Sequence, residues 1–359
     1  MTGTPRSTAL ATRALLLVAV AGVGCQPMHD PDPDGDGIAD DCVIPAQGLP
    51  DDVFCTGLYL DRDSTQLVES VLPYKPGVTL WSDGAEKHRY LQLPAGATID
   101  TSDLDVWKFP VDTKAWKEFV VDGVLVETRI FWKRDEADWA SGTYIWDAEG
   151  AEAALNISKT PTLLANGYEI PTLKDCGRCH HGGADKLLGL EAVALALPTA
   201  EGVTLAGLVA DGRLTAPPAA TTIALPEDAT GKAGVALGFL HANCGMPCHS
   251  SRGLGDETEL VLRLTANEFW PPELGGAAMT VDATQTEAYL ATVMVEPTTK
   301  SVAQKFPDAL RITPGDHEQS LLWLMSNRRD DYAMPPLVSH VIDDAENQAL
   351  AAWIDALPP

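Results

Sequence analysis

Two cysteine-rich runs constrain this chain more than any other feature. Residues 176–180 read C-x-x-C-H, and residues 244–249 read C-x-x-x-C-H, with one extra residue between the cysteines. The first spacing is the attachment signature of a covalent c-type haem, because two thiols one turn apart can each add to one vinyl group of a porphyrin. The sequence therefore predicts two covalent haems c. The cysteines would hold the porphyrins and the histidines the irons: Cys176, Cys179 and His180, and Cys244, Cys248 and His249.

Other chemistry uses paired cysteines too. Four cysteines could hold one tetrahedral zinc, or each pair could close a disulfide. Neither alternative requires a histidine directly after the second cysteine, and only eight histidines occur in 359 residues. We therefore favour haem at both runs. The extra residue in the second run is tolerable if the loop bulges, and Pro247 favours a turn there.

The overall charge is strongly acidic. Against 25 basic side chains stand 51 acidic ones, which gives a formal charge of −26. Such a surface argues against nucleic acid and against attachment to anionic lipid through charge. It fits a soluble carrier that meets a basic partner protein, although solubility alone is the commoner meaning of an acidic surface. The length and a hydrophobic content of 45% indicate two or three domains with cores of their own.

The first 25 residues are typical of an export signal. Arg6 and Arg13 precede an apolar run at 14–21, which is too short to span a bilayer. Small residues then lead to Cys25, an arrangement that resembles a bacterial lipobox, except that Gly22 replaces the usual leucine. We expect a lipid anchor at Cys25 that holds the protein in the bacterial envelope, facing the periplasm or the cell exterior. Ordinary secretion is the alternative.

Residues 26–55 form an acidic tether. Val43 stands where a calcium-binding EF-hand loop would have its glutamate, so a solvated linker explains the tether as well as calcium does. In an oxidising compartment we expect Cys42 and Cys55 to form a disulfide. The alternating aspartates that would bind calcium are Asp32, Asp34, Asp36 and Asp40.

The segment from 56 to 165 has the pattern of an all-β module. Aromatic and β-branched runs alternate with turn signals, and Asp122-Gly123 between two such runs predicts a hairpin. We expect a sandwich with tryptophans mainly in its core. Residues 82–89 are charged, and a solvated loop is favoured there over a general acid or base. Six tryptophans lie in this segment: Trp81, Trp107, Trp116, Trp132, Trp139 and Trp146.

The remaining chain is expected to be mainly α-helical. Residues 166–235 would form the first haem-binding segment and a linker, and residues 236–359 a second haem domain like cytochrome c. Apolar residues at helical spacing predict a closing helix, with Asp343 and Asp344 as candidate caps.

These features carry a resemblance to known proteins. The two cysteine runs, the A-M-P-P run at 333–336 and the last helix LAAWIDALP resemble the C-terminal parts of bacterial c-type cytochromes. With LWSDGAEKHRYLQLPAGATI at 80–99, the chain further resembles exported proteobacterial dihaem proteins that have a β-rich front module. In c-type cytochromes an M-P-P run presents the distal methionine. The resemblance therefore implies that Met334 is the distal ligand of the second haem.

The distal ligand of the first haem is less constrained. His241 lies on a predicted helix before the second run and is the preferred candidate, with Met279 or Met294 as alternatives. Met325, on the helix before Met334, is interpreted as a core residue.

Together these features predict an envelope-anchored dihaem c-type cytochrome that passes single electrons to a redox partner. The main alternative is a dihaem oxidoreductase resembling a peroxidase, with one haem open to substrate. A third reading makes the β module a binding domain for carbohydrate or protein.

Overall fold

The computed structural model of the chain describes residues 38, 42–62, 65–180 and 185–359. The lipidation site predicted at Cys25 lies outside these residues. So do the predicted calcium ligands Asp32, Asp34, Asp36 and Asp40.

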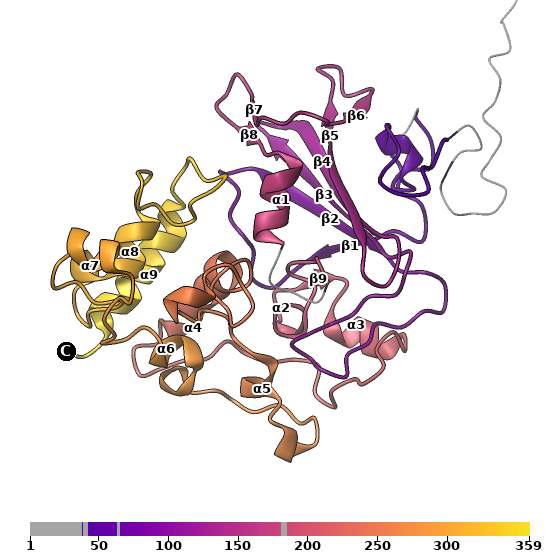
Figure 1. Ribbon diagram of the computed structural model, residues 1–359. Coiled ribbons are helices and arrows are strands. Elements are labelled where there is room, and N and C mark those ends of the chain that lie inside the picture. Colours follow the sequence, from indigo (N-terminus) through magenta and orange to yellow (C-terminus); the bar gives the residue numbers. More distant parts are fainter. Residues whose placement is uncertain (1–37, 39–41, 63–64, 181–184) are drawn as a thin grey trace, which may run out of the picture.

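The N-terminal half forms one seven-stranded antiparallel sheet in the order β6-β5-β4-β3-β2-β1-β9 (Figure 1). A sandwich was expected, but β2 to β6 pair in sequence order into one layer, with a long connection over residues 93–113 between β2 and β3 and short turns between the later strands. Helices and loops rather than a second large sheet pack against this layer. Strands β7 and β8 form a separate two-stranded ribbon. The strands are β1 (Leu72–Lys75), β2 (Glu86–Gln92), β3 (Lys114–Val121), β4 (Val124–Lys133), β5 (Trp139–Trp146), β6 (Ala153–Leu155), β7 (Thr162–Leu163), β8 (Glu169–Ile170) and β9 (Glu201–Gly202).

The hairpin predicted at Asp122-Gly123 joins β3 to β4. Both turn residues have positive φ, 52° and 79°, as the two central residues of a type I′ turn require. A β-bulge between Phe119 and Val120 then shifts the register by one residue. The bulge brings Arg129 opposite Lys117, and this determines which side chains share a face of the sheet.

The later part of the chain holds short helices separated by long irregular segments (Figure 1). The closing helix α9 is confirmed, and its predicted cap Asp343 accepts a hydrogen bond from the Glu346 N–H at 3.3 Å. No helix within the described ranges is long and apolar enough to cross a membrane. The helices are α1 (Leu173–Cys179), α2 (Ala192–Ala196), α3 (Leu205–Ala210), α4 (Ala233–Leu240), α5 (Ala266–Phe269), α6 (Glu287–Leu290), α7 (Lys300–Lys305), α8 (Leu321–Ser326) and α9 (Asp344–Ala356).

One apolar core runs through both parts. It joins Tyr74 and Leu91 of the sheet to Leu237 of α4 and Trp353 of α9. Strand β9 lies within the segment expected to follow the first haem run, yet it pairs with β1. Five of the six tryptophans at 56–165 are buried, as predicted: Trp107, Trp116, Trp132, Trp139 and Trp146. The sixth, Trp81, lines the cavity described below.

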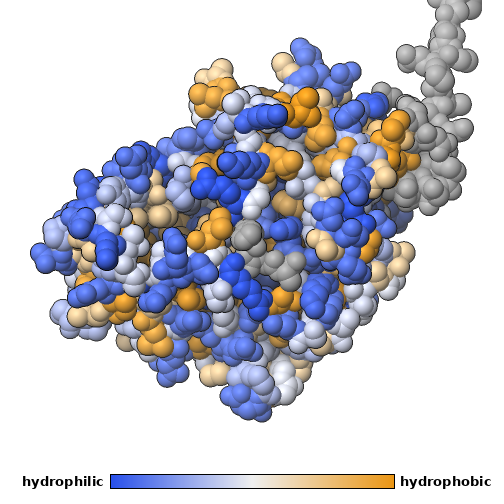
Figure 2. Space-filling model, viewed as in Figure 1, coloured by the Kyte–Doolittle hydropathy of each residue, from blue (hydrophilic) through white to orange (hydrophobic). Residues whose placement is uncertain are grey.

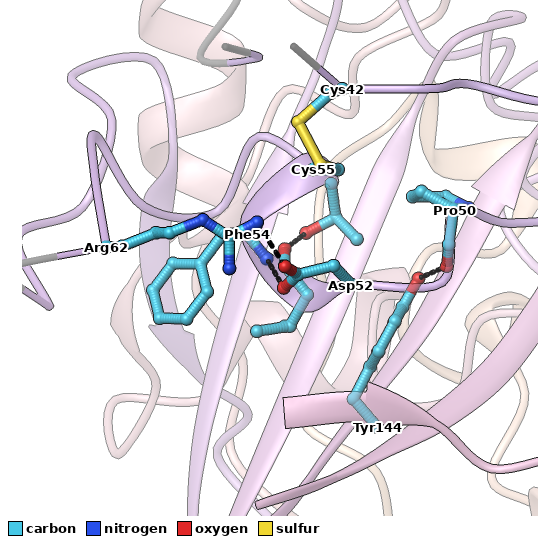
Figure 3. The surroundings of a disulfide bond; sticks show 9 residues. Cys42, Pro50, Asp52, Phe54, Cys55, Arg62 and Tyr144 are labelled. Atoms are coloured by element: carbon cyan, nitrogen blue, oxygen red, sulfur yellow. Dashed lines mark hydrogen bonds and ion pairs between the residues drawn. A yellow bond between two sulfur atoms is a disulfide. The ribbon is translucent and has the colours of Figure 1, made fainter. Parts of the chain in front are cut away.

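The predicted disulfide between Cys42 and Cys55 is present (Figure 3). The segment that it closes is tied to the sheet, because the Tyr144 hydroxyl on β5 donates to the Pro50 carbonyl at 2.8 Å. Within the segment Asp52 accepts from the Phe54 N–H at 3.0 Å. The disulfide therefore fastens the end of the acidic tether to the β-sheet.

Candidate functional site

Both cysteine runs line a single cavity of about 550 Å³, a size within the range of sites for small molecules and cofactors. One part of its wall comes from strands β2 to β4 and helix α1, and another from α4, α7 and α8. The lining includes every predicted cysteine and histidine of the two runs: Cys176, Cys179, His180, Cys244, Cys248 and His249.

Helix α1 presents the first run. It begins at a capping box in which the Thr172 hydroxyl and the Asp175 carboxylate each accept from the other's backbone N–H. At its end the His180 N–H donates to the Cys176 carbonyl at 3.1 Å. One helical turn thus carries both thiols and delivers His180 directly after them.

The His180 ring is oriented for metal binding. Its Nδ1 lies 2.5 Å from the Lys186 carbonyl oxygen, and since a carbonyl only accepts, Nδ1 must carry the proton. Nε2 is therefore left with a free lone pair. The ring packs against Phe131 with centroids 4.4 Å apart. Burial, aided by Lys117, lowers the pKa of His180 to about 3, so the imidazole is neutral, as a ligand must be.

A buried ion pair fixes the carbonyl that holds His180. Lys133 is 1% exposed, and its ammonium lies 2.9 and 3.0 Å from the two carboxylate oxygens of Asp185, the neighbour of Lys186. The same carboxylate accepts from the Trp139 indole at 2.8 Å and from the Phe109 N–H at 2.5 Å. The pair therefore ties the loop after the first run to the end of β4.

The second run has the same design with a wider turn. In the first run the hydrogen bond from the His180 N–H to the Cys176 carbonyl spans four residues. In the second run the corresponding bond, from the His249 N–H to the Cys244 carbonyl at 2.8 Å, spans five residues. A π-helical turn at His241–Gly245 precedes it. The extra residue is therefore absorbed by a π-type turn, a feature frequent at functional sites, and the histidine still follows its thiols closely.

His249 carries its proton on the same ring nitrogen as His180. The Thr258 hydroxyl donates its only hydrogen to the Gly255 carbonyl at 2.6 Å, so its contact with His249 Nδ1 at 3.4 Å is as an acceptor. Nε2 is again the free nitrogen. The chain wraps closely here, since a Cβ on Gly253 or Gly255 would lie within 3 Å of Cys248 or His249. Burial, with Arg311 nearby, lowers the pKa of His249.

The four thiols are unpaired, so the disulfide alternative is not formed. Within the described part of the chain, no three His, Cys, Asp or Glu side chains gather into one group. Burial raises the pKa of all four, that of Cys244 to about 12. Burial and the neighbouring Cys179 raise the pKa of Cys248, and both cysteines line the same cavity.

The predicted distal ligands occupy different settings. Met334 lines the cavity, and its N–H donates to the Met325 carbonyl at 2.9 Å. His241 also lines the cavity, but its Nδ1 accepts from the Leu264 N–H at 3.0 Å and its Nε2 lies 3.4 Å from the Glu191 carboxylate. This is the opposite tautomer to that of the two run histidines. To bind iron, His241 would have to give up its Glu191 partner, and the assignment stays a prediction.

Six cations among the described residues of this acidic protein line the cavity, and the sequence analysis did not select them. The outer face shown in Figure 2 is mostly hydrophilic, with hydrophobic side chains scattered over it. Charged residues in the middle of aromatic-rich strands were the available signal, because such positions are seldom solvated on both sides. The six are Arg89, Lys117, Arg129, Arg178, Arg311 and Arg329.

Met279 and Met294, the alternatives for the first haem, are 43% and 64% exposed and do not line the cavity.

Comparison of the chain with protein-family models, curated proteins and solved structures finds no match. Its function must therefore be argued from the site alone.

Lys133→Met should destabilise the protein by about 3–5 kcal/mol, because it leaves the buried Asp185 charge unpaired. The double variant Lys133→Met, Asp185→Asn should recover part of this loss. Denaturant unfolding measures both. Lys108→Met, at an exposed lysine of the same module, is the control. Equal losses in the single and double variants would show that the pair is not the source of the effect.

Proposed function

We propose that this protein is a dihaem c-type cytochrome that passes single electrons. One observation carries the proposal: both Cys-Cys-His runs face one cavity with free thiols and with the Nε2 of each histidine unprotonated. A tetrahedral metal site needs several converging ligands, whereas a haem needs one proximal histidine and two thiols per run. The residues present therefore fit haem better than zinc.

The chain supplies attachment, orientation and tuning. A haem held here would exchange one electron between the ferrous and ferric states of its iron. Lys186 and Thr258 hold the Nδ1 protons of the two histidines, which fixes ring orientation and ligand basicity. Because Cys179 and Cys248 line the same cavity, porphyrins attached to the two runs would share it, and an electron could pass between them inside the protein.

The proposal also includes the predicted haem domain, lipid anchor, redox partner and calcium site. The C-terminal part would be a mainly α-helical haem domain like cytochrome c. Cys25 would carry a lipid anchor in the bacterial envelope, and the acidic surface would meet a basic redox partner. Calcium at the aspartates of the tether is a further proposal, which a calcium titration of the mature protein tests.

The mature protein should carry two covalent haems, counted by intact mass and by a pyridine haem assay. The variant Cys244→Ser, Cys248→Ser should lose one haem and keep the other. The disulfide variant Cys42→Ser, Cys55→Ser should keep both and serves as the matched control. A wild-type mass equal to that of the bare polypeptide would refute the proposal.

Met334→Ala should lower one of the two midpoint potentials and remove the weak long-wavelength band of the oxidised protein. A thioether is a soft donor that favours ferrous iron, so its loss lowers the potential. Redox titration and absorption spectra measure both effects. Met279→Ala, at an exposed methionine, is the control. If the band persists in Met334→Ala, the ligand is another methionine, with Met325 next in line.

A second candidate is an oxidoreductase with one open haem, and the setting of His241 favours it. Both ring nitrogens of His241 already have protein partners, so the first iron would keep a vacant position. Such an enzyme should bind one carbon monoxide per reduced chain, and His241→Ala should not alter that number. A carrier in which His241 is the distal ligand should bind carbon monoxide only after His241→Ala.

A further inference from the structure

Three cations form a row across neighbouring strands of the sheet. Arg89 on β2 lies directly opposite Lys117 on β3, which lies directly opposite Arg129 on β4. All three line the cavity. Like charges in directly opposite positions destabilise a sheet. A row of this kind therefore needs a compensating negative charge.

Among the described residues, carboxylates pair with one member of the row. Arg129 donates from Nε and Nη2 to the two carboxylate oxygens of Glu127, at 2.9 and 2.5 Å. Arg89 and Lys117 have no carboxylate within 4 Å among the residues that the structure describes, and Arg89 is only 6% exposed. Burial, then Arg89 and Arg129, lowers the pKa of Lys117 to about 7, so its surroundings oppose its charge.

The neighbours of the row indicate what kind of anion it accepts. Phe119 and Phe131 lie on the same strands and also line the cavity, so the wall is aromatic next to the cations. The first run lies beside this wall, because Cys176 and Cys179 line the same cavity and the Phe131 ring packs against His180 with centroids 4.4 Å apart. A flat apolar group with attached carboxylates matches such a wall.

We propose that Arg89 and Lys117 bind the propionate carboxylates of the porphyrin attached at Cys176 and Cys179. This inference rests on the proposed function and adds to it the charge partner of the first haem. The bound carboxylates would neutralise the row, and the row would hold the porphyrin edge in one orientation. The sheet would then serve as the platform for the first haem.

The sign of the stability change caused by one substitution, Lys117→Met, tests this proposal. In the haem-loaded protein, Lys117→Met should lower the folding equilibrium constant about tenfold, because it removes a charge-assisted hydrogen bond. In the variant Cys176→Ser, Cys179→Ser, which lacks the first haem, the same change should raise stability, because it removes an unpaired cation. Denaturant unfolding measures both. The control Lys75→Met, at an exposed lysine on β1, should neither lower the stability of the haem-loaded protein nor raise that of the variant without the first haem.

A second measurement needs no haem-free variant. The propionate bending bands in the resonance Raman spectrum should shift in Lys117→Met and in Arg89→Gln, and should not shift in Lys75→Met. Unshifted bands in both cavity variants would overturn the proposal. So would a loss of stability equal in size in the loaded and haem-free backgrounds.

Inorganic sulfate separates the propionates from a free anion. Sulfate should stabilise the variant without the first haem, and Lys117→Met should abolish that stabilisation. In the loaded protein, sulfate should give no stabilisation that depends on Lys117. Stabilisation of the loaded protein that Lys117→Met abolishes would mean that the row takes a free anion, against the proposal. A wild-type chain without haem, seen by mass, would instead refute the proposed function itself.

Discussion

The site depends on how the two run histidines are held. In each, Nδ1 points to an oxygen of a neighbouring loop, Lys186 for His180 and Thr258 for His249, and this leaves Nε2 toward the cavity. The loops are in turn fixed by buried groups. The Lys133–Asp185 pair holds the first, and Arg311, which donates to the Thr258 and Glu259 carbonyls, holds the second.

The two loops use different chemistry for the same task. A buried lysine–carboxylate pair is costly to desolvate, but here its carboxylate also accepts an indole and a backbone N–H, so its hydrogen-bonding capacity is used. Arg311 makes no ion pair among the described residues and instead donates to three carbonyls. Both arrangements link the cavity wall to the core, so a change in packing far from the thiols can reach the histidines.

The shared cavity ties the β-sheet to the cysteine runs. Strands β2 to β4 supply part of the cavity wall, and the apolar core of the sheet continues into α4 and α9. This explains why charged residues stand in the middle of aromatic strands. They face a cavity, and the opposite face of the same strands packs around Trp116 and Trp132.

The sequence by itself determined the cysteine runs, the disulfide, the Asp122-Gly123 hairpin and the capped closing helix, because each depends on local spacing or on turn chemistry. It could not place Arg129. A regular hairpin from that turn would put Thr128 opposite Lys117, and the bulge at Phe119 and Val120 turns Arg129 to the cavity face instead. The tautomer of His241 was also hidden, since its partners Glu191 and Leu264 lie 50 and 23 residues away. Register and long-range hydrogen bonds are settled only when the core packs, and they decide which side chains meet in the site.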